Sequence, residues 1–358
     1  MTAVLLLGGT GAVGRGCLDA LRRTADVTVT LAGRDEQRLA ALADPATTVV
    51  HADLRAPDRI ADLAAEADVV INCAGPSHRY SAAVAGAVIA AGAAYVDPGG
   101  DDALLERLRA QAPTAPVVLQ AGVQPGISGL ALRAIAERLD GEVDEFTVWC
   151  GGLQPLTAAA IEEYLASLRG DTGTGTVLRG SRRMRVPANS MPRPPAPHFP
   201  ESAVAHIHLD EETAAVAAAL GVSEVSWANV SDGSHTTSAI GRLHAETGDQ
   251  PLTSDRLAAT LAAARLDLFG RAPYFTLVAR AEGPSGAASS TFTCTDSYAA
   301  SGAVAAVAAL NTAATPIGVH PLWALEPMPL FAALAAAVPG LRIDIGTDAE
   351  TAVEQGAL

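Results

Sequence analysis

Apolar residues in the first third of the chain recur in two alternating patterns. Short continuous apolar runs predict buried strands, and longer stretches with apolar residues on one face predict helices. The strands are expected at Ala3–Leu7, Val27–Ala32, Thr48–His51, Asp68–Cys73, Ala94–Asp97 and Val117–Gln120. The intervening helices are expected at Val13–Arg23, Arg55–Glu66, Ser81–Ala91 and Ala103–Gln111. This alternation predicts an α/β domain over residues 1–121, with a parallel sheet covered on both faces.

The pattern changes in residues 122–296, where we expect a second domain of α+β type with a mostly antiparallel sheet. Its strands are expected at Glu145–Cys150, Arg183–Val186, Ala203–His208, Glu224–Val230, Tyr274–Ala281 and Ser290–Thr295, and its helices near Ala158–Leu168, Glu211–Leu220 and Ser254–Leu268. Residues 297–358 are expected to return to the first domain. Because such a sheet leaves one apolar side uncovered, we also expect a homodimer formed through the second domain.

The first strand runs into a glycine-rich segment, VLLLGGTGAVGRG at Val4–Gly16. Its glycines stand in GxGxxG spacing, which alone is a weak signal, but here a strand precedes them and a helix follows. This is the context of a Rossmann dinucleotide-binding turn, in which the helix N-terminus binds the pyrophosphate. The residues expected to bind the cofactor here are Gly9, Thr10, Gly11, Ala12, Val13 and Gly14.

The end of the second strand usually distinguishes NADP from NAD. Arg34 follows Gly33 directly, and a guanidinium there suits a 2′-phosphate, so NADP is the predicted cofactor. NAD stays open as an alternative, because Asp35 could bind a ribose hydroxyl and Arg34 could lie on the adenine. Asp53, at the end of the third strand, is expected to contact the adenine, with a helix N-cap as the alternative.

Composition narrows the classes of function. The net charge is −15 with a pI near 4.9, which argues against a nucleic-acid or anionic-membrane surface. No segment has the form of a signal peptide or membrane span, so we expect a soluble cytoplasmic protein. All 24 cationic residues are arginine, which excludes a Schiff-base lysine or a lysine general acid. The four cysteines are scattered, and no metal site is predicted.

Several motifs resemble the saccharopine dehydrogenase-like family. An apolar strand, an Ala-Gly-Pro turn at Ala74–Pro76, a helix of small residues and a Tyr-Val-Asp strand end follow one another as in that family. Further similar segments are QAGVQPGISGLALRAIAERL from Gln120, VWCGGLQP from Val148 and TDSYAASGAVAAVAAL from Thr295. They occur in the family's order over most of the chain. One departure is Gln124, where the family has Asp before Pro-Gly.

The resemblance implies an NADPH-dependent oxidoreductase that reduces a C=N bond. The absence of lysine sets the chain apart from lysine-forming saccharopine dehydrogenases. It is instead similar to the homospermidine, carboxynorspermidine and thiazolinyl imine reductase branches, the last belonging to siderophore assembly. Small residues at the turns, with Trp149 and Trp323 on returning segments, favour a cyclic imine over a carboxylate-bearing one. The predicted substrate is therefore a thiazolinyl imine, as a small molecule or on a carrier protein, with a saccharopine- or carboxynorspermidine-type substrate as the alternative.

The proton for such a reduction requires an acid near the nicotinamide. In a doubly wound sheet the nicotinamide lies beyond the carboxyl ends of the strands, where Ala74, Gly75 and Pro76 are expected to border it. The candidate catalytic residues are Tyr80, His320 and Asp97, each with a structural alternative: helix capping, loop packing and turn formation, respectively. His235 is a further candidate from the second domain.

Two other classes of function remain open. A sensor or scaffold that binds NADP without turnover would account for the first domain alone, and steady NADPH oxidation by an imine would exclude it. A lipid-associated oxidoreductase-like member of the same family would be expected to carry a longer hydrophobic membrane-associating segment, which the sequence lacks.

Overall fold

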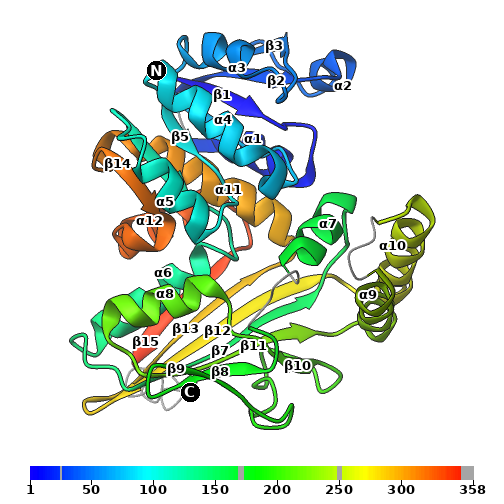
Figure 1. The fold of residues 1–358 in the computed structure, drawn as a ribbon, viewed down its shortest axis with the longest axis vertical. Coiled ribbons are helices and arrows are strands. Elements are labelled where there is room, and N and C mark those ends of the chain that lie inside the picture. Colours follow the sequence, from blue (N-terminus) through cyan, green and yellow to red (C-terminus); the bar gives the residue numbers. More distant parts are fainter. Residues whose placement is uncertain (25, 168–172, 248–251, 348–358) are drawn as a thin grey trace. The chain divides into compact units, whose positions relative to one another are not determined.

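The computed structural model describes residues 1–24, 26–167, 173–247 and 252–347. The chain divides into two compact units (Figure 1). The first comprises Met1–Leu130 and Tyr298–Pro339, and the second comprises Ala131–Ser297 together with the chain from Gly340 onward. The second unit therefore begins nine residues later than the boundary expected from the sequence, because part of the segment after residue 121 packs with the first unit.

The first unit is built on a sheet of seven strands that all pair in parallel. Their order is β14-β6-β5-β4-β1-β2-β3, the Rossmann order with β14 added at one edge. The predicted doubly wound parallel sheet is thereby confirmed. The strands are β1 Thr2–Leu7, β2 Val27–Gly33, β3 Thr47–His51, β4 Val69–Asn72, β5 Ala94–Val96, β6 Pro116–Leu119 and β14 Gly318–Pro321.

Helices cover both faces of this sheet because its central strands are apolar on both sides. Leu5 and Leu7 of β1 pack in one core with Ile60, Val88 and Leu105, which come from α3, α4 and α5. On the other side, α1 packs with α11 and contacts α12. The helices of this unit are α1 Ala12–Thr24, α2 Glu36–Ala40, α3 Pro57–Ala64, α4 Ser77–Ala91, α5 Asp102–Arg109, α11 Ser297–Leu310 and α12 Pro327–Ala337; α6 Ile127–Arg138 begins here and continues into the second unit.

The second unit contains a mixed sheet of eight strands with the order β15-β13-β12-β7-β11-β8-β9, and β10 also pairs with β11. Only the pairing of β7 with β11 is parallel, so the predicted mostly antiparallel sheet is confirmed. The strands are β7 Glu145–Leu153, β8 Thr176–Arg179, β9 Arg182–Arg185, β10 Val204–Ile207, β11 Glu224–Ser231, β12 Tyr274–Gly283, β13 Gly286–Cys294 and β15 Arg342–Thr347.

Four further helices belong to this unit: α7 Ala158–Ser167, α8 Glu211–Leu220, α9 Ser234–Thr247 and α10 Ser254–Leu268. The sequence analysis did not predict α9. Its first turn is capped from a distant element, because the Asp267 carboxylate accepts the amide N–H of His235 at 3.1 Å and of Thr236 at 2.7 Å.

The face of this sheet that was expected to be apolar is polar at one end. Phe292 of β13 and Ile343 of β15 share the covered side, while Thr291 and Asp344 share the opposite side. Thr291 is partly exposed and Asp344 exposed. The premise of the dimer expectation, an uncovered apolar face, is therefore not met here, although the homodimer itself stays a prediction.

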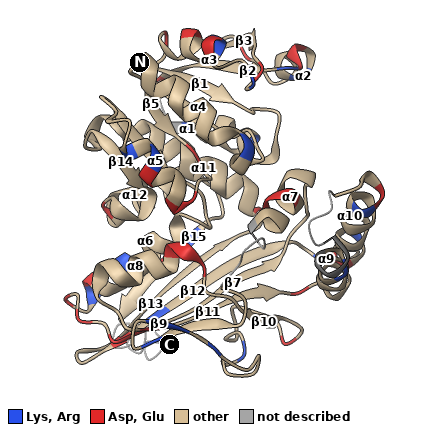
Figure 2. Ribbon diagram, in the orientation of Figure 1, with Lys and Arg blue, Asp and Glu red and all other residues tan. Residues whose placement is uncertain are grey.

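The C-terminal segment does not return to the first unit as a whole. Helix α11, strand β14 and helix α12 belong to the first unit, but β15 pairs antiparallel with β13 in the second sheet. Among the described residues, no helix has both the length and the apolar character needed to cross a bilayer. Acidic and basic side chains are spread over both units, with a run of arginines at β8 and β9 (Figure 2).

Candidate functional site

In the turn between β1 and α1, backbone atoms pack so closely that there is no room for side chains at two glycines. Gly8, which the sequence analysis did not single out, has a φ of +78°, and a Cβ there would lie 2.6 Å from the Ala74 nitrogen. Its carbonyl accepts the amide N–H of Gly11 at 2.9 Å. A Cβ on Gly14 would lie 2.2 Å from that same carbonyl oxygen. Side chains at Gly8 and Gly14 are therefore excluded by the closure of the turn itself.

The outer side of this turn is open. Gly11 and Ala12 are exposed, and a Cβ on Gly11 would meet only the Gly8 carbonyl, at 3.3 Å. Helix α1 starts at Ala12 and has no acidic residue in its first turn. Free amide groups and the positive end of the helix dipole therefore face an accessible surface, which fits the pyrophosphate of a dinucleotide. The predicted residues Gly9 to Gly14 thus form one continuous cradle, with Thr10 partly buried in it.

Two arginines and one aspartate lie at the adjacent ends of β2 and β3. Gly33 is in register with His51, so Arg34 and Asp53 follow neighbouring strand ends. Arg55, which the sequence analysis did not name, forms an ion pair with Asp53 in which Nη2 lies 2.6 Å from Oδ2. The side-chain and backbone hydrogen bonds from Arg55, and to a smaller extent the charge of Arg34, hold the pKa of Asp53 well below its usual range. The group carries a net positive charge, as a 2′-phosphate site requires.

Two alternatives left open by the sequence can be compared with this geometry. The Asp35 carboxylate accepts the amide N–H of Arg38 at 3.0 Å and so caps helix α2. Asp53 does not cap α3, whose N-cap is Ala56, because its oxygens accept the Nε–H, Nη–H and amide N–H of Arg55. Both carboxylates are thus engaged within the protein, while the guanidinium of Arg34 is exposed.

A buried polar network lies at the carboxyl ends of β4 and β5. Asp97 Oδ2 accepts the hydroxyl of Ser81 at 2.6 Å, the hydroxyl of Tyr95 at 2.6 Å and the amide of Asn72 at 2.9 Å. Its other oxygen, Oδ1, accepts the amide N–H of Gly99 at 2.8 Å. The side chains of this network are almost entirely removed from solvent. Burial raises the pKa of Asp97, while its hydrogen-bond donors act in the opposite direction.

This network fixes the turn that was expected to border the nicotinamide. Asn72 Oδ1 accepts the amide N–H of Ala74 at 3.3 Å, and Ser81 lies on α4, which begins directly after Pro76. Asp97 is therefore placed to position Ala74, Gly75 and Pro76 rather than to reach a substrate, because it is only 2% exposed. Sequence reasoning placed Asp97 at the right strand end but could not show that Asn72, Ser81 and Tyr95 converge on it.

Tyr80 lies in the first turn of α4 and is partly exposed. The pKa of Arg55 is raised, first by its hydrogen bond to Asp53 and to a smaller extent by the nearby Tyr80. Tyr80 therefore lies at the same end of the sheet as the glycine turn, Arg34 and Arg55. Of the three candidate catalytic residues, Tyr80 combines this position with a partly exposed side chain.

His320 lies elsewhere in the first unit. It was expected in a loop but belongs to β14, the outermost strand, in register with Val118 of β6. One of its ring nitrogens, Nε2, lies 3.0 Å from the carbonyl oxygen of Pro316. His235 belongs to the second unit, where its Nδ1 lies 2.8 Å from Asp267 Oδ1. Of the two histidines, His320 thus lies on the edge strand of the unit that contains Tyr80, and His235 lies in the other unit.

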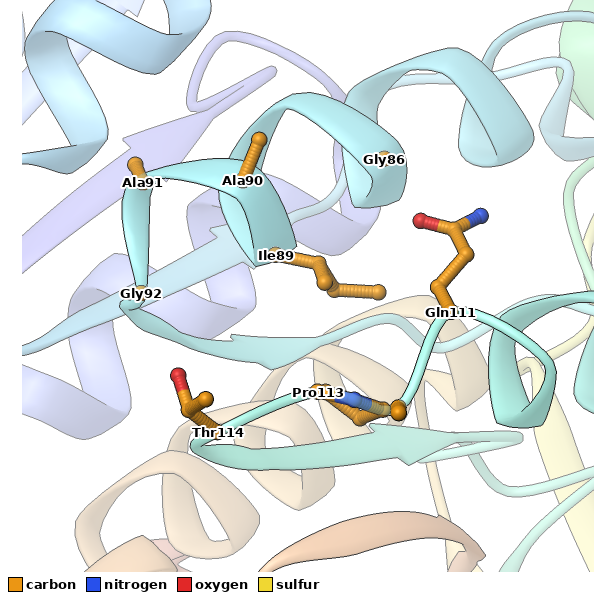
Figure 3. A pocket seen from close by; sticks show the side chains of 9 residues that line it. Gly86, Ile89, Ala90, Ala91, Gly92, Gln111, Pro113 and Thr114 are labelled. Carbon is orange, nitrogen blue, oxygen red and sulfur yellow. The ribbon is translucent and has the colours of Figure 1, made fainter.

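A shallow hollow of about 470 Å³ opens at the other end of the first sheet (Figure 3). It is lined by the C-terminal part of α4, from Gly86 to Gly92, and by the loop Gln111–Thr114 before β6. No charged side chain lines it, and it lies at the amino ends of the strands. It is therefore separate from the glycine turn, since dinucleotides bind at the carboxyl ends of such sheets.

Comparison with known proteins shows what the two units resemble. Residues 4–121 match the family described as Saccharopine dehydrogenase NADP binding domain. A Mycobacterium tuberculosis protein, provisionally named as a trans-acting enoyl reductase, is 30% identical over 189 residues. The alignment covers 47% of this chain and 45% of that protein, so the chain spans about half the length of the curated relatives it matches.

Solved structures show the same fold over nearly the whole chain. Saccharopine dehydrogenase (L-Glu forming) from Saccharomyces cerevisiae superposes with a TM-score of 0.70 at 17% identity, covering 97% of this chain and all of that one. Homospermidine synthase from Legionella pneumophila, solved with NAD, has a TM-score of 0.65 at 11% identity and covers 96% of this chain and 91% of that one. Residues 4–121 are therefore similar to the saccharopine dehydrogenase NADP-binding domain, and the glycine turn lies within that match.

Proposed function

We propose that this protein is an NADPH-dependent reductase that acts on a polarised double bond. The main support for this proposal is the position of the open glycine turn at Gly11 and Ala12. It lies at the same end of the sheet as two cationic side chains, Arg34 and Arg55. The turn fits a pyrophosphate and the cations fit a 2′-phosphate. NADP, rather than NAD, accounts for both features, because the neighbouring carboxylates of Asp35 and Asp53 are already engaged.

When bound, the cofactor supplies a hydride, and the remaining tasks fall to the chain. The backbone from Gly9 to Gly14 orients the pyrophosphate. The turn Ala74–Pro76 borders the nicotinamide and is held in place by the buried Asp97 network. Such fixed positioning matters because hydride transfer requires the two reacting carbons within about 3 to 3.5 Å of each other.

The second task is delivery of a proton to the atom that gains negative charge. No lysine is present in the chain, so the donor is a hydroxyl, an imidazole, a carboxylic acid or water. We assign this role to Tyr80, because it is partly exposed at the end of the sheet that carries the cofactor features. Asp97 acts as a positioning residue in this scheme, since its carboxylate is surrounded by four hydrogen-bond donors.

Two acceptors fit this scheme. The sequence motifs favour a C=N bond, with a carrier-bound or free thiazolinyl imine as the specific substrate. The mycobacterial relative is named an enoyl reductase, which favours a C=C bond conjugated to a carbonyl, and this is the acceptor that we propose first because that relative shares 30% identity over 189 residues. We propose that this carbonyl belongs to a thioester. In both reactions one hydride and one proton are added across the double bond. The difference lies in which atom takes the proton, nitrogen or carbon.

One experiment tests both acceptors. Oxidation of NADPH is followed by absorbance with a crotonyl thioester of pantetheine and, separately, with a thiazoline thioester of pantetheine. Turnover of the crotonyl compound alone supports the enoyl assignment, and turnover of the thiazoline alone supports the imine. If NADPH binds in a titration but neither compound is reduced, whether free or on a carrier protein, the reductase proposal is wrong and a non-catalytic NADP-binding role replaces it.

A further inference from the structure

In one stretch of this acidic chain, every charged residue is an arginine. Residues 173–200 contain no aspartate and no glutamate, although the chain as a whole carries a net charge of −15. The stretch contains five arginines: Arg179, Arg182, Arg183, Arg185 and Arg193. Four of them lie within seven residues, so the positive charge is concentrated at a single place in the fold.

That place is the outer edge of the second sheet. Strands β8 and β9 form a hairpin, here called the basic hairpin (residues 176–185), in which Val177 is in register with Met184. Strand β9 is the last strand in the sheet order, and all four of its residues are exposed. Figure 2 shows the arginines of this edge in blue. The edge therefore offers charged side chains to an incoming partner.

The arginines of the basic hairpin fall into two groups. Arg179 donates to Ser226 Oγ at 2.9 Å and lies 3.7 Å from a carboxylate oxygen of Glu224, and Arg183 lies 2.6 Å from a carboxylate oxygen of Glu211. These contacts anchor the hairpin on its own unit. Arg182 and Arg185 form no ion pair with any of the described residues, so their charge is available to another molecule.

An apolar side chain lies next to one of these two arginines. Met184 is 49% exposed and lies two residues after Arg182, on the same side of the strand, whereas Arg185 lies on the opposite side with Arg183. An exposed methionine flanked by arginines is the composition of a protein interface, where a small apolar centre is surrounded by charged groups that set orientation. Guanidinium groups bind carboxylates in a planar, bidentate manner. A partner with acidic side chains is thus the one that this edge fits.

We propose that the basic hairpin docks an acidic carrier protein that delivers the substrate as a thioester. This inference rests on the proposed function and takes the substrate to be bound to a carrier rather than free. The net charge of the protein repels an acidic partner over most of its surface, so a local cluster of arginines decides where that partner can approach. Arg182 and Met184 contact the partner from one side of the edge strand and Arg185 from the other, and Arg179 and Arg183 hold the hairpin in place.

The test separates docking from catalysis. Binding of a purified, phosphopantetheinylated acyl carrier protein is measured by fluorescence anisotropy for the wild type and for the Arg182→Glu/Arg185→Glu variant. The matched control is Arg242→Glu/Arg265→Glu, which makes the same charge change on the exposed faces of α9 and α10. We expect the hairpin variant to weaken binding about tenfold or more, the control to weaken it less than about threefold, and added salt to weaken wild-type binding.

Turnover gives the second readout. With a crotonyl group on the carrier protein, the hairpin variant should raise KM about tenfold, whereas KM for crotonyl-pantetheine should stay unchanged. Equal binding by wild type and hairpin variant, or equal losses in the hairpin and control variants, would overturn the docking proposal. So would a hairpin variant whose main change is a halved mass in light scattering, because the edge would then join two copies of this chain. If neither crotonyl compound is reduced, the enoyl assignment fails, while the anisotropy result still decides the docking proposal.

Discussion

Gly302 of α11 lies so close to α1 that a Cβ on it would be 2.0 Å from the carbonyl oxygen of Val13. The reverse contact is equally close, because a Cβ on Gly16 of α1 would be 2.4 Å from the Ala299 α-carbon. The two helices therefore meet backbone to backbone at these two glycines. Since α1 carries the glycine turn at its start, α11 fixes the position of the helix end that would face the pyrophosphate.

Replacement of Gly302 by alanine should therefore destabilise the protein. Alanine would normally favour a helix interior by about 0.8 to 1 kcal/mol over glycine. Here the methyl group would overlap with α1, so we expect a net loss of about 1 to 3 kcal/mol in the free energy of unfolding. The matched control is Gly241→Ala in α9, where nothing lies within 4 Å of the added Cβ. It should raise stability, and urea unfolding of both variants checks the two signs.

Arg34 should decide the preference between the two nicotinamide cofactors. We expect Arg34→Ala to weaken NADPH binding about tenfold or more while NADH binding changes little, because the lost interaction is a charge-assisted pair with the 2′-phosphate. Arg55→Ala should have the same selectivity with a smaller effect, since Arg55 also pairs with Asp53. Fluorescence titration with both cofactors measures this. Equal losses for NADPH and NADH would contradict the assignment.

Asp97 should make the stability of the first unit depend on pH in a defined direction. Burial raises its pKa above the ordinary value of 3.8, so the folded protein holds this proton more tightly than the unfolded chain. Its contribution to the free energy of unfolding is thus greatest below about pH 3.8 and falls as the pH rises through the raised pKa. Asp97→Asn removes this titration and should cost about 1 to 3 kcal/mol through lost hydrogen bonds.

Urea unfolding from pH 4 to neutral pH checks this dependence. The difference in stability between wild type and Asp97→Asn should decrease as the pH rises, whereas Asp62→Asn on the exposed side of α3 should give a small, constant difference. A difference that grows with pH would mean that the hydrogen bonds from Ser81 and Tyr95 outweigh burial, and the assigned direction would be wrong.

Tyr80 should carry the proton-transfer step. Loss of a general acid typically lowers the rate 100-fold or more, so Tyr80→Phe should reduce single-turnover NADPH oxidation by about that factor with NADPH affinity retained. His320→Asn should change the rate less than about threefold. Its strand is three positions from β4 in the sheet, about 14 Å at the usual strand spacing. A comparable loss in His320→Asn would show that β14 borders the nicotinamide after all.

The sequence predicts a homodimer formed through the second unit, and we keep this prediction. Because Ser289, Thr291, Thr293 and Asp344 line the open side near β13 and β15, we expect such a dimer to be weak and sensitive to concentration and salt. Light scattering at low and high micromolar protein should show the mass rising toward twice 36.3 kDa. A monomer mass at every concentration would contradict the expectation.

The sequence determined the elements whose hydrophobic pattern is strong. The predicted helices Glu211–Leu220 and Ser254–Leu268 have the observed bounds of α8 and α10, and strands β1 to β6 lie within one or two residues of their predicted ends. Local patterns suffice there because buried strands and amphipathic helices require apolar residues at fixed spacings. For the same reason the glycine turn and Arg34 could be assigned to a dinucleotide site from sequence spacing alone.

Only the tertiary structure decided where distant residues meet. Strand β14 exists because Gly318–Pro321 pairs with β6, about 200 positions earlier in the chain, and helix α9 is capped by Asp267 rather than by a neighbouring residue. The enclosure of Asp97 by Asn72 and Ser81 likewise depends on elements that become adjacent only in the folded sheet. Such contacts have no local sequence signal, since hydrogen bonds and burial between remote segments form only when the chain has folded.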